Sequence, residues 1–305
     1  MQKQERRTSS EHAARAALDR LYLDFDLRPE VADPVHLVRR YPDPLDQEVA
    51  GFCAAGLAFG RVASVLSSVE SLLSAMGPSP AAFVRGFDPS RSHRAIQALR
   101  HRWIGGRDLV ALLVILRHMV NTSGSIERFF LSGYCPEDED IGSALDHFCT
   151  RAREVDLGQV YGAGVTRRGV MYFFPRPSDG SACKRLNLYL RWMVRHDHID
   201  FGAWSKVDRS KLVVPLDTHV IRVGQCLRLT SYRSPGWPMA REITQMLRRL
   251  DPDDPVKYDF SLCHVGMQDA CGFSRPQGDQ RCPLRGVCLP NPDTPRRSRR
   301  SSGRH

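Results

Sequence analysis

One lysine stands where a protein could place a nucleophile. Lys184 follows the stretch PRPSDGSAC, in which two prolines impose an extended approach and Ser178 to Gly180 supply turn residues. The segment from Ser181 to Arg195 has helical periodicity, so we expect Lys184 in the first helical turn. Free backbone N–H groups at a helix N-terminus bind phosphate, and the helix dipole there disfavours a protonated ammonium. Lys184 is therefore a candidate nucleophile, provided that apolar neighbours also desolvate it.

Asp217 is the second chemical feature and follows Lys184 by 33 residues. The run LVVPLDTHVIRVG places it after a short apolar stretch and a proline, at the start of a helix whose Val220, Val223 and Leu227 face inward. An aspartate in that position can simply cap the helix. Its chemical interest comes from its occurrence together with Lys184.

These two segments resemble the helix-hairpin-helix superfamily of DNA glycosylases, which includes endonuclease III and oxoguanine glycosylase. In that superfamily a hairpin of the form G-x-G-x-K presents the catalytic lysine, and a later V-D-T-H-x-x-R-V segment presents the essential aspartate. The counterparts here are GSACK, from Gly180 to Lys184, and LDTHVIRV, from Leu216 to Val223. Ala182 stands in place of the usual second glycine. Both segments are also similar in sequence to an uncharacterised bacterial family, DUF2400, which is related to the archaeal oxoguanine glycosylases.

The resemblance covers most of residues 10 to 290 and implies base excision on double-stranded DNA. Lys184 would attack C1′ of a damaged nucleotide extruded into a pocket, displace an oxidised purine, and form a Schiff base that allows strand cleavage. Asp217 would stabilise the developing oxocarbenium charge and assist proton transfer. The implied enzyme is a monomeric DNA glycosylase with AP lyase activity that requires no cofactor.

The resemblance also implies how DNA is held. The hairpin's backbone amides would bind phosphate, and nearby polar and basic side chains would join them. The residues expected at this interface are Gly180, Ser181, Ala182, Arg185, Lys211, His219 and Arg222. Two alternatives stay open: a non-catalytic helix-hairpin-helix protein that binds nucleic acid, and a helical protein in which the basic residues have no such role.

Four cysteines crowd the C-terminal part of the chain: Cys263, Cys271, Cys282 and Cys288. Endonuclease III relatives hold an iron–sulfur cluster with C-x6-C-x2-C-x5-C, whereas the spacing here is C-x7-C-x10-C-x5-C. Four thiolates would still fit an iron–sulfur cluster, and the last three with His264 would fit zinc. The short C-x2-C chelate is missing, so a metal-free loop is the third interpretation.

The elements that must position these residues are predominantly helical. Apolar side chains recur at helical spacing in residues 44–59, 62–73, 108–120 and 139–155, and no alternating strand pattern of comparable length appears. We expect an all-α fold resembling the two-lobed glycosylases. Residues 1–9 are predicted to be a flexible N-terminus, residues 10–289 one glycosylase-like domain with its hairpin near 175–185, and residues 290–305 a basic disordered tail. The stretch from Tyr161 to Gly180, rich in glycine, proline and aromatics, is predicted to interrupt the helices.

Charge favours a polyanionic partner. The formal net charge is +10, and the last eleven residues contain five arginines and no acid. Neither a signal peptide nor an apolar run of membrane-spanning length is present, so a cytoplasmic, nucleoid-associated protein without a membrane partner is expected. The other five cysteines, Cys53, Cys135, Cys149, Cys183 and Cys226, lie in or beside apolar stretches and are expected to be reduced core residues.

Overall fold

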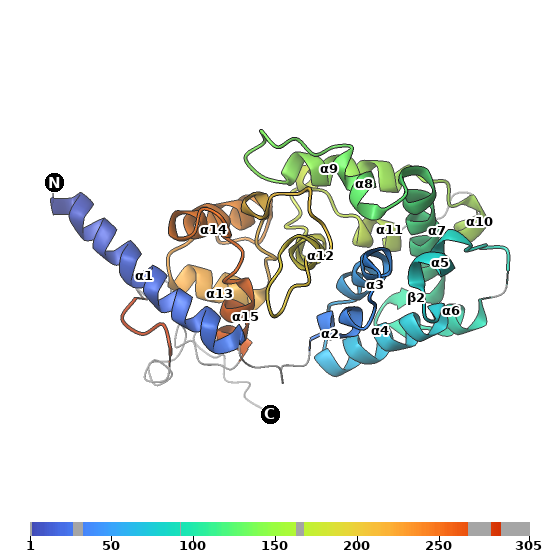
Figure 1. Cartoon of the computed structure of the whole chain (residues 1–305), viewed down its shortest axis with the longest axis horizontal. Helices are drawn as coiled ribbons and strands as arrows, with labels where there is room; N and C mark the ends of the chain where they lie inside the picture. The colour runs from blue at the N-terminus through green and yellow to red at the C-terminus, as the bar shows by residue number, and fades with distance from the viewer. Residues whose placement is uncertain (1, 27–32, 92, 163–167, 268–281, 288–305) are drawn as a thin grey trace, which may run out of the picture.

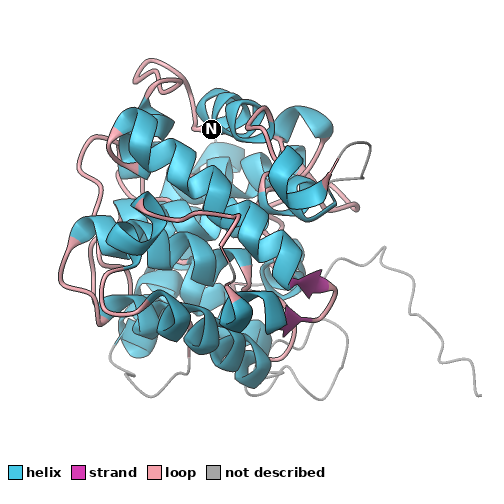
Figure 2. Cartoon of the chain, turned by 90° about the vertical axis from the view of Figure 1, so that its right-hand side faces the viewer, coloured by secondary structure: helices cyan, strands magenta, loops and turns pink. Residues whose placement is uncertain are grey.

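The protein is described here from a computed structural model, which describes residues 2–26, 33–91, 93–162, 168–267 and 282–287. Most of these residues are helical, and two short antiparallel strands lie at one edge (Figures 1 and 2). The elements are α1 (Gln2–Asp26), α2 (Val35–Arg39), α3 (Pro44–Gly56), α4 (Val62–Met76), α5 (Pro80–Arg85), α6 (Arg94–Ala98), β1 (Arg100–His101), β2 (Ile104–Gly105), α7 (Gly106–Ser123), α8 (Ile126–Leu131), α9 (Gly142–Arg153), α10 (Gly158–Tyr161), α11 (Arg168–Phe173), η1 (Pro177–Asp179), α12 (Lys184–Val194), η2 (Arg209–Lys211), α13 (Thr218–Cys226), α14 (Trp237–Leu250) and α15 (Asp259–Met267).

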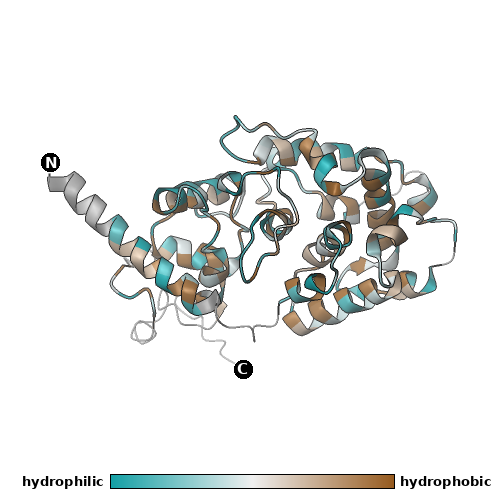
Figure 3. Cartoon of the chain, viewed as in Figure 1, coloured by the Kyte–Doolittle hydropathy of each residue, from teal (hydrophilic) through white to brown (hydrophobic). Residues whose placement is uncertain are grey.

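The helices gather in two groups with α12 between them. Helices α2 to α11 form one group around α3 and α7, whereas α1, α13, α14 and α15 form the other (Figure 1). The hydrophobic character of α7 is evident in Figure 3, and its middle from Leu109 to Leu116 is buried throughout. Buried side chains from both groups belong to one continuous hydrophobic core. The predominantly helical prediction is confirmed, while a glycosylase-type fold stays a prediction.

Helix α12 packs tightly against α3. Tyr189, Trp192 and Met193 of α12 are almost fully buried. A Cβ atom at Gly51 of α3 would lie 2.5 Å from the Met193 Cε atom, so glycine permits the close approach of the two helices. Because α12 begins at Lys184, this packing fixes the position of the candidate nucleophile.

Glu48 of α3 holds two other segments in place. Its buried carboxylate accepts hydrogen bonds from the backbone N–H groups of Ile126 and Glu127 at 2.8 and 3.0 Å, and from Trp204 Nε1 at 2.8 Å. Burial raises the pKa of Glu48 to about 7 in spite of these donors. The start of α8 and the segment after α12 are thereby joined to the core.

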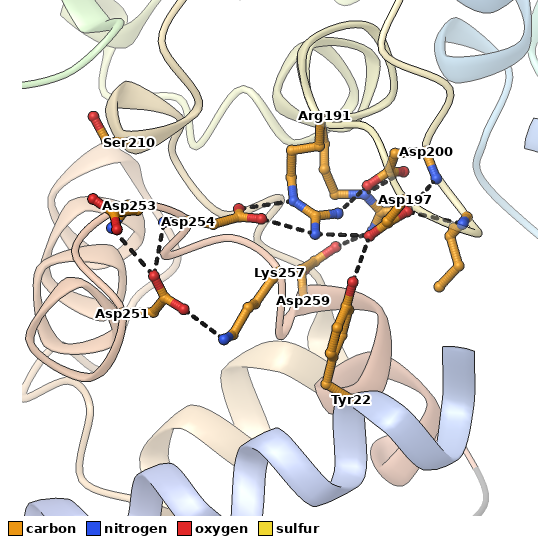
Figure 4. Close-up of polar contacts among 12 residues, drawn as sticks. Tyr22, Arg191, Asp197, Asp200, Ser210, Asp251, Asp253, Asp254, Lys257 and Asp259 are labelled. Carbon is orange, nitrogen blue, oxygen red and sulfur yellow. Dashed lines mark hydrogen bonds and ion pairs between the residues drawn. The ribbon is translucent and has the colours of Figure 1, made fainter. Parts of the chain in front are cut away.

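A buried ionic network connects α12 to the second group of helices (Figure 4). Arg191 pairs with Asp200 and Asp259, and Arg195 pairs with Asp197, Asp200 and Asp254.

The N-terminal helix α1 joins this network. Its Tyr22 hydroxyl donates to Asp197 at 3.1 Å, and Asp19 accepts from the Tyr258 hydroxyl at 2.6 Å. Lys257 pairs with Asp251, as Figure 4 shows, and also with Asp19 of α1. Residues 2–9, predicted to be flexible, form the first part of this helix.

Several details differ from the sequence-based predictions. The stretch from Tyr161 to Gly180 contains a short helix, α11, because Val170 and Phe173 pack into the core at helical spacing. Helix α12 begins three residues later than predicted, and residues 100–105 form the small hairpin of β1 and β2. Cys135 is exposed, not a core residue, because it lies in the loop between α8 and α9. The predicted basic tail lies outside the described residues.

Among the described helices, none is both long enough and apolar enough to cross a lipid bilayer.

Candidate active site

A compact turn leads the chain into α12. Gly180 adopts a left-handed conformation with φ of 78°, directly after the η1 turn. The turn is tied down by Asp179, which pairs with Arg153 and Arg176 at 2.9 and 2.6 Å. These hydrogen bonds, that from Arg176 first, lower the pKa of Asp179 to about 2.

The second left-handed residue of this turn is Cys183, with φ of 48°. The superfamily pattern places its second glycine at the position of Ala182, one residue earlier. In this chain Ala182 has no positive φ, so alanine is compatible with the turn. Cys183 immediately precedes α12, and its buried thiol contacts the Pro175 carbonyl oxygen at 3.3 Å.

Asp217 caps α13 as the sequence predicts. Its Oδ1 accepts from the backbone N–H groups of His219 and Val220 at 2.8 and 2.7 Å. Val220 and Val223 are buried and anchor the helix, while Leu227 is half-buried. This arrangement leaves the other carboxylate oxygen, Oδ2, available for contacts beyond the helix.

The two predicted residues come together in space. Lys184 Nζ lies 3.8 Å from Asp217 Oδ2, although 33 residues separate them in the sequence. The Lys184 side chain is 38% exposed and that of Asp217 is 13% exposed. The lysine is thus accessible to a ligand while its carboxylate partner is largely withdrawn from solvent.

Both side chains line a pocket of about 380 Å³ between the two groups of helices. This volume lies within the range of about 300–1,000 Å³ typical of small-molecule sites. Apolar walls are supplied by Phe59, Leu188 and Phe260, whereas Arg191 and Asp259 of the ionic network form part of its polar surface.

Some residues that line the pocket bury polar side-chain atoms. In the described part of the chain, four buried atoms of its lining residues find no hydrogen-bond partner. They are Arg191 Nη2, Trp192 Nε1, His219 Nδ1 and Asp259 Oδ1. Buried polar groups are rarely left unpaired, but these four atoms are enclosed, so a ligand would reach them only after the lining side chains move.

Asp259 is the most unusual of these groups. It is 3% exposed and pairs with Arg191 through one oxygen only. Burial raises the pKa of Asp259 to about 6, with Asp217 contributing in the same direction and Arg191 opposing it. Sequence analysis missed this residue because a single aspartate at the start of α15 resembles an ordinary helix-terminal acid.

Cys263 also contacts the catalytic candidates. Its thiol donates to Asp217 Oδ2 at 3.2 Å, and burial raises the pKa of the thiol far above its usual range. The metal prediction grouped Cys263 with Cys282, which is buried, and with Cys271 and Cys288, which lie outside the described residues. Within the residues that the structure describes, no three His, Cys, Asp or Glu side chains converge as metal ligands.

The residues expected to bind DNA occupy different surroundings. Gly180 is exposed and Ser181 and Ala182 are partly exposed at the turn before α12. His219 lines the pocket, and Arg222 is half-buried on α13.

Two of the expected DNA contacts are engaged inside the protein. Arg185 stacks its guanidinium 3.4 Å from the centre of the Tyr172 ring and donates to the Tyr172 carbonyl oxygen. Lys211 Nζ donates to the Asp138 carbonyl oxygen at 2.8 Å. Their contact with DNA stays a prediction.

Comparison with known proteins places the chain in a family. Residues 33–268 match the family described as a protein of unknown function, DUF2400, and the chain belongs to it. No curated protein matches the chain, and no solved structure does so either. The matched region contains Lys184, Asp217, Asp259 and Cys263.

Proposed function

We propose that the protein is a DNA glycosylase with associated AP lyase activity, acting on an oxidised purine in double-stranded DNA. The observation that carries this proposal is the approach of Lys184 and Asp217 to 3.8 Å at the wall of a pocket. The resemblance of the two segments to the glycosylase superfamily assigns the pair its chemistry, and the net charge of +10 suits a polyanionic substrate.

The chemistry begins with transfer of a proton from the Lys184 ammonium to a base. Asp217 is the acceptor nearest to it among the proposed catalytic groups. The Nζ lone pair then forms a bond to C1′ of the sugar. The glycosidic bond breaks, its electron pair leaves with the base, and Asp217 gives the proton it accepted to the departing base. The Asp217 carboxylate that this transfer regenerates stabilises the positive charge that develops on the sugar.

The lyase step uses the covalent intermediate. Opening of the sugar ring transfers the C1′–O4′ electron pair to O4′, which takes up a proton, and leaves an iminium between Nζ and C1′. Removal of a proton from C2′ then expels the 3′ phosphate, which breaks the strand. Water attacks C1′ to release Lys184.

The pocket supports binding of an extruded base. An enzyme that attacks C1′ inside a duplex must rotate the nucleotide out of the stack. The Phe59 and Phe260 rings offer apolar contact to a purine, and the polar lining residues Thr218 and His219 offer hydrogen-bonding groups to its edge.

Borohydride trapping tests the proposal. Wild-type protein is incubated with duplexes containing an oxidised purine or an abasic site, and a covalent adduct is scored by its reduced mobility in denaturing electrophoresis. Lys184→Gln removes the amine and is expected to abolish trapping. Lys206→Gln, which alters an exposed lysine outside the pocket, is the matched control and is expected to trap as wild type does.

Two results would overturn the proposal. One is the absence of any wild-type adduct and of base release across the duplexes. The other is trapping by Lys184→Gln at the wild-type level. Tight DNA binding without base release, unchanged in Lys184→Gln, would instead identify a non-catalytic nucleic-acid-binding protein.

A further inference from the structure

Trp103 is the exposed tryptophan of this chain. Its side chain is 51% exposed, whereas Trp192, Trp204 and Trp237 are buried. It lies in the turn between β1 and β2, next to Arg102, whose φ of 55° gives the turn its left-handed residue. Single exposed apolar side chains are common on protein surfaces, so what distinguishes Trp103 is the set of contacts and charges around it.

Aromatic contacts hold this indole in a fixed orientation. Its ring centre lies 4.5 Å from that of Tyr172 in an edge-to-face arrangement and 6.3 Å from that of Phe59. Tyr172 is itself held between Phe59, at 5.0 Å, and the guanidinium of Arg185, at 3.4 Å. The indole therefore loses little conformational freedom when a partner binds.

The same contacts connect Trp103 to the pocket. Phe59 and the adjacent Gly60 both line it. The Arg102 side chain passes within 3.2 Å of the position that a Cβ atom would occupy on Gly60. The β1–β2 turn therefore lies beside the pocket wall formed by Ala58, Phe59, Gly60 and Val62.

The surroundings of Trp103 are basic. Arg61, Arg100 and Arg102 are exposed on the segments next to it. Residues 57–107 contain seven arginines and two acidic residues. An exposed aromatic ring among arginines matches a nucleic-acid strand, in which charged phosphates alternate with flat bases.

We propose that Trp103 stacks on a DNA base beside the nucleotide held in the pocket, while the neighbouring arginines contact the backbone phosphates. This inference rests on the proposed function, since it takes DNA as the ligand. Extrusion of one nucleotide breaks the continuous stack of the duplex, and the exposed face of the indole replaces the lost neighbour.

Binding measurements test the inference. Fluorescence anisotropy compares two labelled duplexes, one intact and one containing a tetrahydrofuran abasic-site analogue. Trp103→Ala is expected to weaken binding of the abasic duplex by about 5- to 100-fold, the range for loss of one base–aromatic stack, and to affect the intact duplex less. Trp103→Phe keeps a ring and is expected to restore most of the affinity. Leu23→Ala removes an exposed apolar side chain from α1, which belongs to the other group of helices, and should bind as wild type does.

The outcomes separate this inference from the proposed function. If Lys184 forms the trapped adduct but Trp103→Ala binds DNA as tightly as wild type does, the inference is overturned and the proposed function is retained. A Trp103-dependent preference for the abasic duplex without trapping and without base release overturns the glycosylase and supports the inference. Unchanged DNA affinity combined with a lower molecular mass of Trp103→Ala in sedimentation would show self-association through Trp103 and also overturn the inference.

Discussion

Arg191 and Arg195 lie one turn apart on or just beyond α12, are equally buried, and share the partner Asp200, yet they differ in how completely they are paired. Arg195 places each guanidinium nitrogen on a carboxylate of Asp197, Asp200 or Asp254. Among the described residues, Arg191 Nη2 finds no partner, and neither does Oδ1 of its partner Asp259.

This difference distinguishes the ion pairs of Arg195 from those of Arg191, which lines the pocket. A fully paired buried charge fixes the packing of the segments that supply its partners. A buried charge with an unused donor or acceptor bears a desolvation cost that a ligand can offset. Arg191 and Asp259 line the pocket, whereas Arg195 does not, so incomplete pairing coincides with the candidate site.

The largest expected effect comes from removing the fully paired arginine. Arg195→Met leaves the buried carboxylates of Asp197 and Asp254 without their cationic partner. The free energy of unfolding should fall by about 3–5 kcal/mol, as when one member of a buried ion pair is removed. Urea denaturation followed by circular dichroism measures the change.

Arg241→Met is the matched control for that experiment. Arg241 pairs with Glu139 and Asp140 but is 38% exposed, so its loss should cost about 1 kcal/mol or less. Equal losses in the two variants would refute the structural role assigned to the Arg195 cluster.

The next effect concerns activity, not stability. Asp217→Asn retains a side-chain oxygen that can cap α13 but removes the negative charge beside Lys184. Base release should fall by about 100-fold or more, while the thermal midpoint stays near that of wild type. A single-turnover assay and a thermal melt measure the two quantities. A variant that loses both activity and stability would indicate that Asp217 serves only the helix.

The smallest expected effect concerns Asp259, which belongs to the ionic network and also lines the pocket. Asp259 titrates in the folded protein at a pKa of about 6, above the ordinary value of 3.8. Between these values the folded state binds more protons than the unfolded state, so stability falls as pH rises from about 4 to about 6 and is constant above. Relative to Asp259→Asn, wild type should lose roughly 2–3 kcal/mol across this window.

Urea denaturation of both proteins at intervals from pH 4 to pH 7 measures that loss. Parallel stability curves for wild type and Asp259→Asn would show that Asp259 has an ordinary pKa. The expected difference between Asp259 and the carboxylates paired with Arg195 would then be refuted.

Much of the scaffold follows from local sequence pattern. Asp43 followed by Pro44 marks the start of α3, and the apolar run after Asp108 marks α7, because capping and helical periodicity act over a few residues. The order of the two segments and their resemblance to the glycosylase motifs predicted that Lys184 and Asp217 lie close together. Neither residue alone predicts this.

The remainder of the site depends on contacts between distant segments. Phe59, Asp259 and Cys263 meet Lys184 only after α3, α12 and α15 have packed together. Their local sequences resemble ordinary core and helix-terminal residues, since burial and unpaired atoms are properties of the folded chain. The same holds for Trp103, whose exposure could not be inferred from an aromatic residue in an arginine-rich stretch.

Arg191 and Arg195 pair with residues much later in the chain, so these ion pairs cannot form until those residues have been synthesised. Arg191 is synthesised 68 residues before Asp259, and Arg195 59 residues before Asp254. At about 5–20 residues per second, a ribosome leaves Arg191 waiting for roughly 3–14 s. During that interval Asp217 is added to the chain that already contains Lys184, whereas α15, which begins at Asp259, has not yet been made. The nascent protein thus contains both residues before it contains the pocket wall that α15 supplies.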